Sequence, residues 1–351
     1  MNDEFYMQRC LELAILGMGK VSPNPMVGCV IVSGAQIIGE GYHQQIGEAH
    51  AEVNAINAVF IKYGDQAPAL LKNAIAYVNL EPCAHFGKTP PCADLLIKHQ
   101  LKKVVIGNTD PFLAVNGKGI AKLKAAAIEV ESGILEEKCA YLNRRFFTRL
   151  QQQRPFIILK WAQTANGYFA PPAGVQEWIS GKVAKQLTHK WRSEEDAVLV
   201  GKNTALIDNP ELTTRLWPGK NPIRILIDKN LTVPENYELY TNESKTIIFN
   251  EVKTEVRDNL HFIQMEDMQF YLAQKIAFQL YLMDIQSVIV EGGQQVLQQF
   301  ITAGLWDEAR IFTADKQWND GIKAPVLEGK LIETIAIGED QLSIYTPSRK
   351  I

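Results

Sequence analysis

Four residues within the first 92 positions of the chain have the types and spacing of a zinc site. His50 and Glu52 stand at the start of a predicted helix, while Cys83 follows a predicted strand over 74–80 and Cys92 opens another helix. One imidazole and two thiolates leave a fourth tetrahedral position open for water, as catalytic zinc requires. We therefore predict zinc on His50, Cys83 and Cys92. Glu52 is close enough in sequence to shuttle a proton between water and a leaving amine.

The order of these residues resembles the His-x-Glu and Pro-Cys…Cys signature of zinc-dependent base deaminases. The chain departs from that signature because eight residues, AHFGKTPP, separate Cys83 from Cys92 where enzymes acting on nucleic acids have two. The alternative interpretation is a chance His-Ala-Glu at a helix start and two buried cysteines. The residues in order, with the expected strand and helix around them, favour the zinc site.

The composition predicts a two-domain globular protein. The 351 residues are 46% hydrophobic and 21% charged, with a formal net charge of −3, which argues against a protein built to bind nucleic acid. No apolar stretch is long enough to span a membrane and the first residues lack a signal-peptide pattern, so we expect a cytoplasmic protein. All five cysteines lie within the first 139 residues, which favours a metal site there over a disulfide framework.

Strands and helices alternate in both halves, which predicts α/β domains with helices on both faces of a sheet. The boundaries we predict are 1–146 for the first domain, 147–154 for a linker and 155–351 for the second domain. A helix over 136–150 should end the first domain. The second half has no G-x-G-x-x-G after a strand, so it lacks a Rossmann dinucleotide fingerprint. The strands expected there are 156–162, 197–201, 223–228, 245–249 and 287–291, with helices near 180–194 and 269–283.

One segment of the second half could hold a phosphate. SVIVEGGQQVLQQF predicts a buried strand, a Gly-Gly turn and a helix, which would expose backbone N–H groups to an anion. Glu291 stands at the carboxyl end of that strand, where ligands gather in α/β sheets. A tight turn without a ligand is the alternative interpretation.

Longer segments of the first half resemble a known family. SPNPMVGCVIV, GYHQQIGEAHAEVNAI and PCAHFGKTPPCADLLI are similar to the deaminase domain of the bifunctional deaminase-reductases of riboflavin biosynthesis. The resemblance implies a cytidine-deaminase-like three-layer α/β/α domain that hydrolyses a ring amine of 2,5-diamino-6-(5-phosphoribosylamino)pyrimidin-4(3H)-one. It places one zinc on His50, Cys83 and Cys92 and the proton shuttle on Glu52. It suggests substrate contacts from Asn24, His43, Lys88 and Thr89.

The second half resembles the reductase domain of the same family through KWAQTANGYFA, EWISG, RSEEDAVLVGKNTALIDNPELTTR and VEGG. This implies a dihydrofolate-reductase-like α/β domain that uses NADPH to reduce the ribosyl group to ribityl. The matching positions for NADPH are Ala162, Trp178, Thr204, Asp208 and the 293–299 turn and helix start, beginning at Gly293. Those around the substrate are Gln176, Arg192, Leu212, Arg215 and Glu291, with Lys160 as a further candidate.

The chain departs from the family pattern at several places. Residues 58–72 resemble an inserted loop, and Phe112 and 115–116 replace an asparagine and small residues near the deaminase pocket. In the reductase half, Asn166 replaces an aspartate, Lys229 replaces a small hydroxyl residue, and 315–325 has an unfamiliar sequence. These changes leave open how the chain contacts NADPH.

Two other functions remain open on the sequence alone. One is a nucleic-acid base deaminase with an accessory domain, which the acidic balance and the cysteine spacing disfavour. The other is a binding module without activity, which the complete His, Glu, Cys, Cys set disfavours for the first half. For the leading hypothesis we expect a small phosphorylated pyrimidine as ligand, no nucleic acid, no membrane, and a homo-oligomer.

Overall fold

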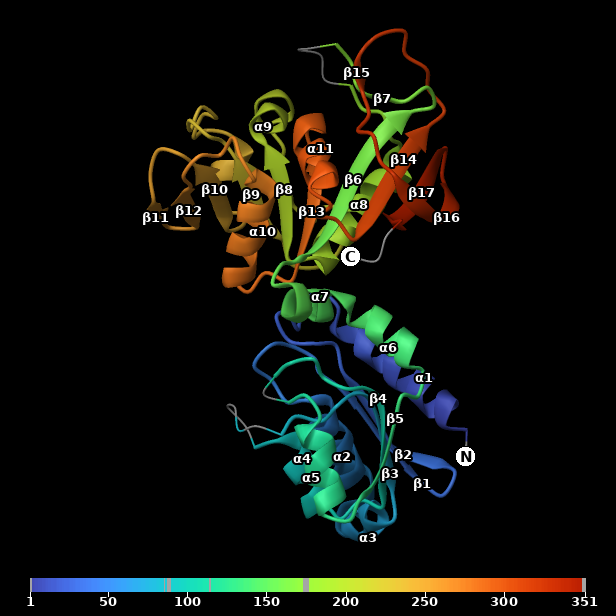
Figure 1. Cartoon of the computed structure of the whole chain (residues 1–351). Helices are drawn as coiled ribbons and strands as arrows, with labels where there is room; N and C mark the ends of the chain where they lie inside the picture. The colour runs from blue at the N-terminus through green and yellow to red at the C-terminus, as the bar shows by residue number, and fades with distance from the viewer. Residues whose placement is uncertain (1, 85, 87–89, 114, 173–176, 349–351) are drawn as a thin grey trace. The chain divides into compact units, whose positions relative to one another are not determined.

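The chain folds into two compact units, Met1–Gln152 and Gln153–Ile351 (Figure 1). The computed structural model describes residues 2–84, 86, 90–113, 115–172 and 177–348. Each unit has its own sheet and its own apolar core, so each is described by itself.

The N-terminal unit is built on a five-stranded sheet in the order β2-β1-β3-β4-β5. Strand β1 runs antiparallel to β2 and β3, and β3, β4 and β5 are parallel. The strands are short runs rich in Val and Ile, which favour a pleated, buried backbone. Their bounds are β1 Gly28–Ser33, β2 Gln36–Tyr42, β3 Ile75–Leu80, β4 Lys103–Asn108 and β5 Glu129–Ser132.

Helices cover both faces of this sheet, as predicted. Alternate residues of a strand point to opposite faces, so Ile31 packs among residues of α2 and α4, whereas Val30 packs among residues of α1. This is the three-layer α/β/α arrangement expected from the sequence. The helices are α1 Asp3–Ala14, α2 Ala51–Tyr63, α3 Ala67–Lys72, α4 Cys92–Lys98, α5 Lys118–Ala125, α6 Glu136–Leu142 and α7 Arg144–Gln152, with 3₁₀ turns η1 Ile15–Gly17 and η2 Gly64–Gln66.

Two segments differ from their sequence interpretation. The expected loop insertion over 58–72 is helical, because α2 continues to Tyr63 and is followed by η2 and α3. Its apolar residues Val59 and Leu71 are fully buried, which a surface loop would not achieve. The helix expected over 136–150 is two helices, α6 and α7, that separate at Asn143. Helix α7 also occupies most of the predicted linker.

The C-terminal unit is built on a ten-stranded sheet in the order β11-β12-β10-β9-β8-β13-β6-β14-β17-β16. The seven strands from β12 to β14 are parallel, and an antiparallel strand or hairpin flanks each edge. The strands of this sheet are β6 Phe156–Thr164, β8 Ala197–Gly201, β9 Ile223–Ile227, β10 Thr246–Asn250, β11 Glu255–Arg257, β12 Leu260–Gln264, β13 Ser287–Gly292, β14 Glu308–Ala314, β16 Gly329–Ile337 and β17 Asp340–Pro347. Strands β7 Tyr168–Ala170 and β15 Ile322–Lys323 form a separate antiparallel pair.

Helices also cover both faces of the second sheet. Residues of α10 and α11 pack on the face that carries Leu159 and Val290, and residues of α8 and α9 pack on the face that carries Ile158 and Ile289 (Figure 1). The parallel strands therefore end together at one edge, where their following turns can form a site. The helices are α8 Lys182–Glu194, α9 Lys202–Asp208, α10 Leu272–Leu282 and α11 Gln294–Thr302, with the 3₁₀ turn η3 Glu238–Tyr240.

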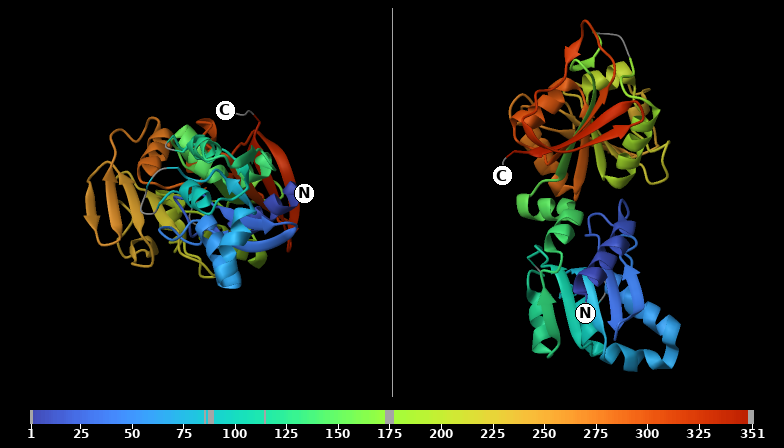
Figure 2. Two further views of the ribbon diagram at one scale, coloured as in Figure 1. Left: turned by 90° about the horizontal axis from the view of Figure 1, so that it is seen from below. Right: turned by 90° about the vertical axis from the view of Figure 1, so that its right-hand side faces the viewer.

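The C-terminal hairpin of β16 and β17 extends the large sheet (Figure 2, right). Strand β16 forms its outer edge, and Leu331 and Ile332 are about half exposed there. Among the helices that the structure describes, none is long and apolar enough to cross a membrane.

Candidate active sites

The predicted zinc ligands meet at one point of the N-terminal unit. His50 is the residue before α2, Cys83 follows β3, and Cys92 begins α4. Their ligand atoms all lie within 4.8 Å of one another, with His50 Nδ1 3.3 Å from Cys92 Sγ and 3.7 Å from Cys83 Sγ. Because two softer thiolates and an imidazole suit zinc, this donor set fits the predicted metal.

The surrounding protein favours metal binding by Cys83 and proton transfer by Glu52. The backbone N–H of Cys92 donates to Cys83 Sγ at 3.2 Å. Hydrogen bonds from Cys92 and His50 lower the pKa of the Cys83 thiol to about 4 despite its burial, so a thiolate ligand is available at neutral pH. Glu52 is only 3% exposed. Burial raises the pKa of its carboxyl group, which favours a group that both takes up and releases a proton.

A cavity of about 500 Å³ opens onto this cluster, a volume typical of small-molecule sites. Asn24 and His43, both predicted to contact substrate, line it. Asn24 Nδ2 donates to His43 Nε2 at 3.1 Å, and His43 Nδ1 lies 3.1 Å from the carbonyl oxygen of Ala49. His43 therefore bridges the cavity wall and the residue before His50, and burial lowers its pKa.

Glu81 is a residue of this pocket that the sequence interpretation missed. Its buried carboxylate accepts backbone N–H groups of Asp110, Gly117, Gly119 and Ile120, at 2.9–3.2 Å. The segment 110–120, which carries pocket-lining Asp110, Phe112 and Val115, is thus tied to the strand end that leads to Cys83. A Cβ atom on Gly119 would lie 2.1 Å from the Pro82 carbonyl oxygen, so this close approach requires glycine. No local sequence motif around Glu81 predicts these distant hydrogen-bond partners.

The predicted linker contributes to the same pocket. Arg149 and Leu150 of α7 line the cavity, so Arg149 brings a cation that sequence reasoning did not assign. Two predicted substrate residues, Lys88 and Thr89, lie outside the described residues.

In the C-terminal unit, two predicted residues contact a third, Glu291 on β13. Arg192 of α8 forms a two-pronged ion pair with it, at 2.7 and 2.8 Å, and Lys160 Nζ of β6 lies 3.7 Å from Glu291 Oε2. Burial by itself would raise the pKa of Glu291, but Arg192 and Lys160 outweigh it and lower the pKa to about 2. Glu291 is therefore a carboxylate at every pH where the protein would work. Burial lowers the pKa of Lys160.

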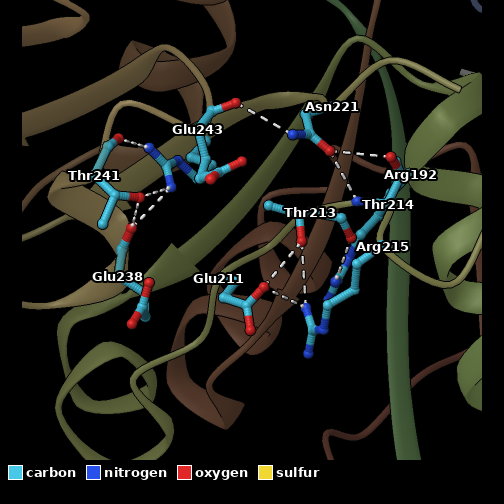
Figure 3. Close-up of polar contacts among 10 residues, drawn as sticks. Arg192, Glu211, Thr213, Thr214, Arg215, Asn221, Glu238, Thr241 and Glu243 are labelled. Carbon is cyan, nitrogen blue, oxygen red and sulfur yellow. Dashed lines mark hydrogen bonds and ion pairs between the residues drawn. The ribbon is translucent and has the colours of Figure 1, made fainter.

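The segment after α9 carries Leu212 and Arg215, two other expected substrate residues, and is linked to Arg192. Arg192 Nη1 donates to the Thr213 carbonyl oxygen at 3.2 Å, which links α8 to the segment that holds Leu212 and Arg215 (Figure 3). Leu212 is buried with φ of 52°, so it sits in the left-handed region that a bulky side chain adopts only when its surroundings enforce it. Gln176 lies outside the described residues.

Two of the predicted NADPH residues, Thr204 and Gly293, meet at the glycine turn between β13 and α11. A Cβ on Gly292 would lie 2.8 Å from Thr204 Oγ1, and one on Gly293 would lie 3.1 Å from it, so Thr204 packs closely against this turn. Gly293 caps α11 without a side-chain hydrogen bond, which leaves backbone N–H groups of the first turn for an anion. This cradle fits the pyrophosphate of a dinucleotide.

The remaining predicted cofactor residues lie in separate places. Ala162 lies on β6, half-buried, and Asp208 ends α9 in an exposed position. Trp178 is 62% exposed with Lys185 Nζ 4.5 Å from its ring centroid. A flat aromatic face at this position could stack against a nicotinamide or adenine ring.

Two of the three departures in the reductase half contact each other. Asn166 donates to the Trp318 carbonyl oxygen at 2.7 Å and accepts the Trp318 N–H at 3.2 Å. Hydrogen bonds therefore connect Asn166 to the unfamiliar segment 315–325 at the end of β6. Lys229 forms an ion pair with Glu251 at 3.1 Å, so the charge of this replaced residue has a partner within the unit.

The first site has the ligands of a zinc-binding deaminase, and the second has a glycine turn and a cluster of charged side chains that suit a reductase. Comparisons with known proteins give the same two classes. The family model described as the cytidine and deoxycytidylate deaminase zinc-binding region matches residues 1–108, and the RibD C-terminal domain matches residues 155–316.

Whole-chain similarities identify the family. The chain is 39% identical to the riboflavin biosynthesis protein RibD of Aquifex aeolicus, over 94% of this chain and 92% of that protein. It is 35% identical to the Escherichia coli RibD, over 90% and 88% of the two chains. The crystal structure of a diaminohydroxyphosphoribosylaminopyrimidine deaminase/5-amino-6-(5-phosphoribosylamino)uracil reductase from Thermotoga maritima covers 98% of each chain with a TM-score of 0.89 and 34% identity. The chain belongs to the RibD family of bifunctional deaminase-reductases in riboflavin biosynthesis.

Family membership confirms the expected classes of fold and cofactor. The N-terminal unit is cytidine-deaminase-like with a zinc-binding region, and the C-terminal unit is a dihydrofolate-reductase-like domain of an NADPH-dependent reductase. The roles of individual site residues stay predictions.

Proposed function

We propose that the N-terminal unit deaminates 2,5-diamino-6-(5-phosphoribosylamino)pyrimidin-4(3H)-one and that the C-terminal unit then reduces its ribosyl group to ribityl. The observation that carries the first step is the convergence of His50, Cys83, Cys92 and Glu52 at one cavity. The reaction name of the Thermotoga maritima relative supports this choice of substrate.

In the deaminase pocket, His50, Cys83 and Cys92 would hold the zinc ion, which supplies Lewis acidity that lowers the pKa of a water molecule to about 7. Glu52 lines the same cavity, two residues after the ligand His50. It accepts a proton at a carboxylate oxygen and returns it to the departing amine. Asn24 offers an amide to the pyrimidine edge, and its hydrogen bond with His43 fixes its orientation.

In the reductase site, NADPH supplies the hydride, and the chain must position the sugar carbon that receives it. The Gly292–Gly293 turn, Thr204 and the N-terminal turn of α11 would hold the cofactor phosphates. Glu291 stays ionised between Arg192 and Lys160. Its carboxylate is placed to accept from sugar hydroxyl groups or to stabilise the cation that forms when the ribosylamine ring opens.

The direct test supplies the diaminopyrimidine substrate with zinc and NADPH, and follows ammonia and NADPH absorbance together. We expect one ammonia released and one NADPH oxidised per substrate, with ammonia appearing first. Ammonia without NADPH oxidation would leave only the deaminase proposal standing. Salt-sensitive deamination of RNA in place of this substrate would overturn both.

We also propose that the protein works as a homo-oligomer in the cytoplasm. The half-exposed apolar residues Leu331 and Ile332 on the edge strand β16 support an association surface, since such edges are usually covered. Free thiols at all five cysteines support a reducing compartment. Light scattering of the full chain tests the first point, and cell fractionation tests the second.

A further inference from the structure

The positively charged side chains around the reductase site differ in how firmly hydrogen bonds and ion pairs hold them. Arg192 gives Nε and Nη2 to Glu291 and Nη1 to the Thr213 carbonyl oxygen, and only 11% of its side chain is exposed. Lys160 also faces Glu291 and is largely buried. Because these two cations are committed to a buried carboxylate, releasing either one for a ligand would leave that carboxylate uncompensated.

Arg215 is held more loosely. Its Nη1 lies 3.2 Å from Glu211 Oε2 and 3.3 Å from Thr213 Oγ1, and the Thr213 hydroxyl donates to the same Glu211 oxygen at 3.3 Å (Figure 3). The side chains of Arg215 and Glu211 are 40% and 41% exposed. A pair this exposed contributes little to stability because water screens it, so a stronger anion can displace the carboxylate.

The backbone around this pair is fixed independently of it. Asn221 Oδ1 accepts both the N–H and the hydroxyl of Thr214, and Asn221 Nδ2 donates to the Glu243 carbonyl oxygen (Figure 3). The Thr213 carbonyl is held by Arg192. Arg215 therefore keeps its place when Glu211 leaves, and the Thr213 hydroxyl between them becomes available to a new acceptor.

We propose that Glu211 is an internal competitor for the phosphate of the reductase substrate: it occupies Arg215 and the Thr213 hydroxyl in the free protein and sets how tightly a phosphate monoester binds there. This inference rests on the proposed reductase function. Glu211 acts through Arg215, so it is a positioning residue that governs affinity and takes no part in hydride transfer.

The test compares Glu211→Gln with Glu235→Gln in the full chain. Glu235 forms another exposed ion pair, with Arg257 at 2.9 Å, so its variant makes the same change in charge without touching Arg215. Steady-state NADPH oxidation with the deaminated substrate gives KM and kcat. Inorganic phosphate is titrated as a competitive inhibitor, and its direct binding is measured by calorimetry, which does not depend on turnover.

We expect Glu211→Gln to lower KM and the phosphate inhibition constant by about two- to fivefold, the range of an exposed ion pair, while kcat stays within about twofold. Glu235→Gln leaves all three unchanged. In an Arg215→Gln background the Glu211 change has no further effect, because the two substitutions act on one contact. Glu211→Ala provides a second variant with the same expected direction.

An unchanged or higher KM in both Glu211 variants would overturn the inference, because Glu211 would then orient Arg215 for the ligand. Equal gains in Glu235→Gln would also overturn it, by showing a general charge effect. A wild-type protein that binds phosphate but does not oxidise NADPH with the deaminated substrate would instead contradict the proposed reductase function. The calorimetric comparison of Glu211→Gln with wild type would still decide the inference in that case.

Discussion

The two sites of this protein bring their functional residues together in different ways. In the N-terminal unit, the key groups stand where α2 and α4 begin and just beyond β3, so short stretches of chain bring His50, Glu52, Cys83 and Cys92 together. In the C-terminal unit, Lys160, Arg192 and Glu291 come from β6, α8 and β13, across more than a hundred residues.

The difference reflects the chemistry each site supplies. A metal requires several donor atoms within bonding distance of one point, and a few local motifs can provide them. Hydride transfer is the cofactor's chemistry, so the reductase needs a fixed arrangement of charges around a substrate, which the whole sheet provides. Substitutions should therefore affect the two activities separately.

The largest effect is expected at Glu52. Glu52→Gln removes the proton shuttle while keeping the size of the side chain, so ammonia release should fall by about 10²- to 10⁴-fold. NADPH oxidation with the deaminated substrate should stay at the wild-type rate, and zinc content, measured by atomic absorption, should not change. Retained ammonia release would assign the proton transfer to another group and weaken the comparison.

Glu291→Gln provides the converse test in the C-terminal unit. The substitution removes the charge that Arg192 and Lys160 surround, and we expect NADPH oxidation to fall by about 10²- to 10³-fold, as for the loss of a preorganised electrostatic group. Ammonia release serves as the internal control and should be unaffected. If both activities fell together, the two sites would not be chemically separate.

Glu81→Gln examines the wall of the deaminase pocket. An amide has one acceptor oxygen, so part of the set of N–H groups from 110–120 loses its partner, at a cost of about 1–3 kcal/mol for each one left unsatisfied. Thermal unfolding should show a less stable N-terminal unit, and the deaminase KM should rise more than kcat falls. Glu129→Gln, which changes an exposed partner of Lys103, is the matched control and should alter neither quantity.

The smallest effect is a pH dependence confined to the C-terminal unit. Burial, with Arg192 and Arg215 nearby, lowers the pKa of His189 from 6.5 to about 4, and the pKa of Glu291 falls from 4.5 to about 2. The unfolded chain therefore binds more protons than the folded one as acid is added, so this stability is complete above pH 6.5 and declines below it. The unfolding temperature should fall from pH 6.5 to 4, and less steeply in His189→Gln. Equal slopes in both proteins would exclude His189 as the cause.

The sequence predicted the elements around the first site well because their signals are local. The sequence predicts a strand over 74–80 and a helix that begins at Cys92, and these are observed as Ile75–Leu80 and Cys92–Lys98. The segment 58–72 was misjudged as a loop because its apolar residues become interpretable only once they pack against the sheet.

The parts that depend on distant contacts could not be predicted. Nothing near Glu81 indicates that its carboxylate will hold a segment about thirty residues later. The sequence predicts Arg149 near the end of a helix over 136–150 and within the linker 147–154, with no role in a pocket, whereas α7 brings it to the lining of the deaminase cavity.

The central claim is that the N-terminal unit carries the deaminase activity and the C-terminal unit carries the reductase activity, each independent of the other. The most direct measurement is ammonia release and NADPH oxidation by the same protein before and after zinc is removed with a chelator. The account predicts that metal-free protein loses ammonia release and still oxidises NADPH with the deaminated substrate, and that added zinc restores the first activity. Loss of both activities on chelation, or of neither, would contradict it.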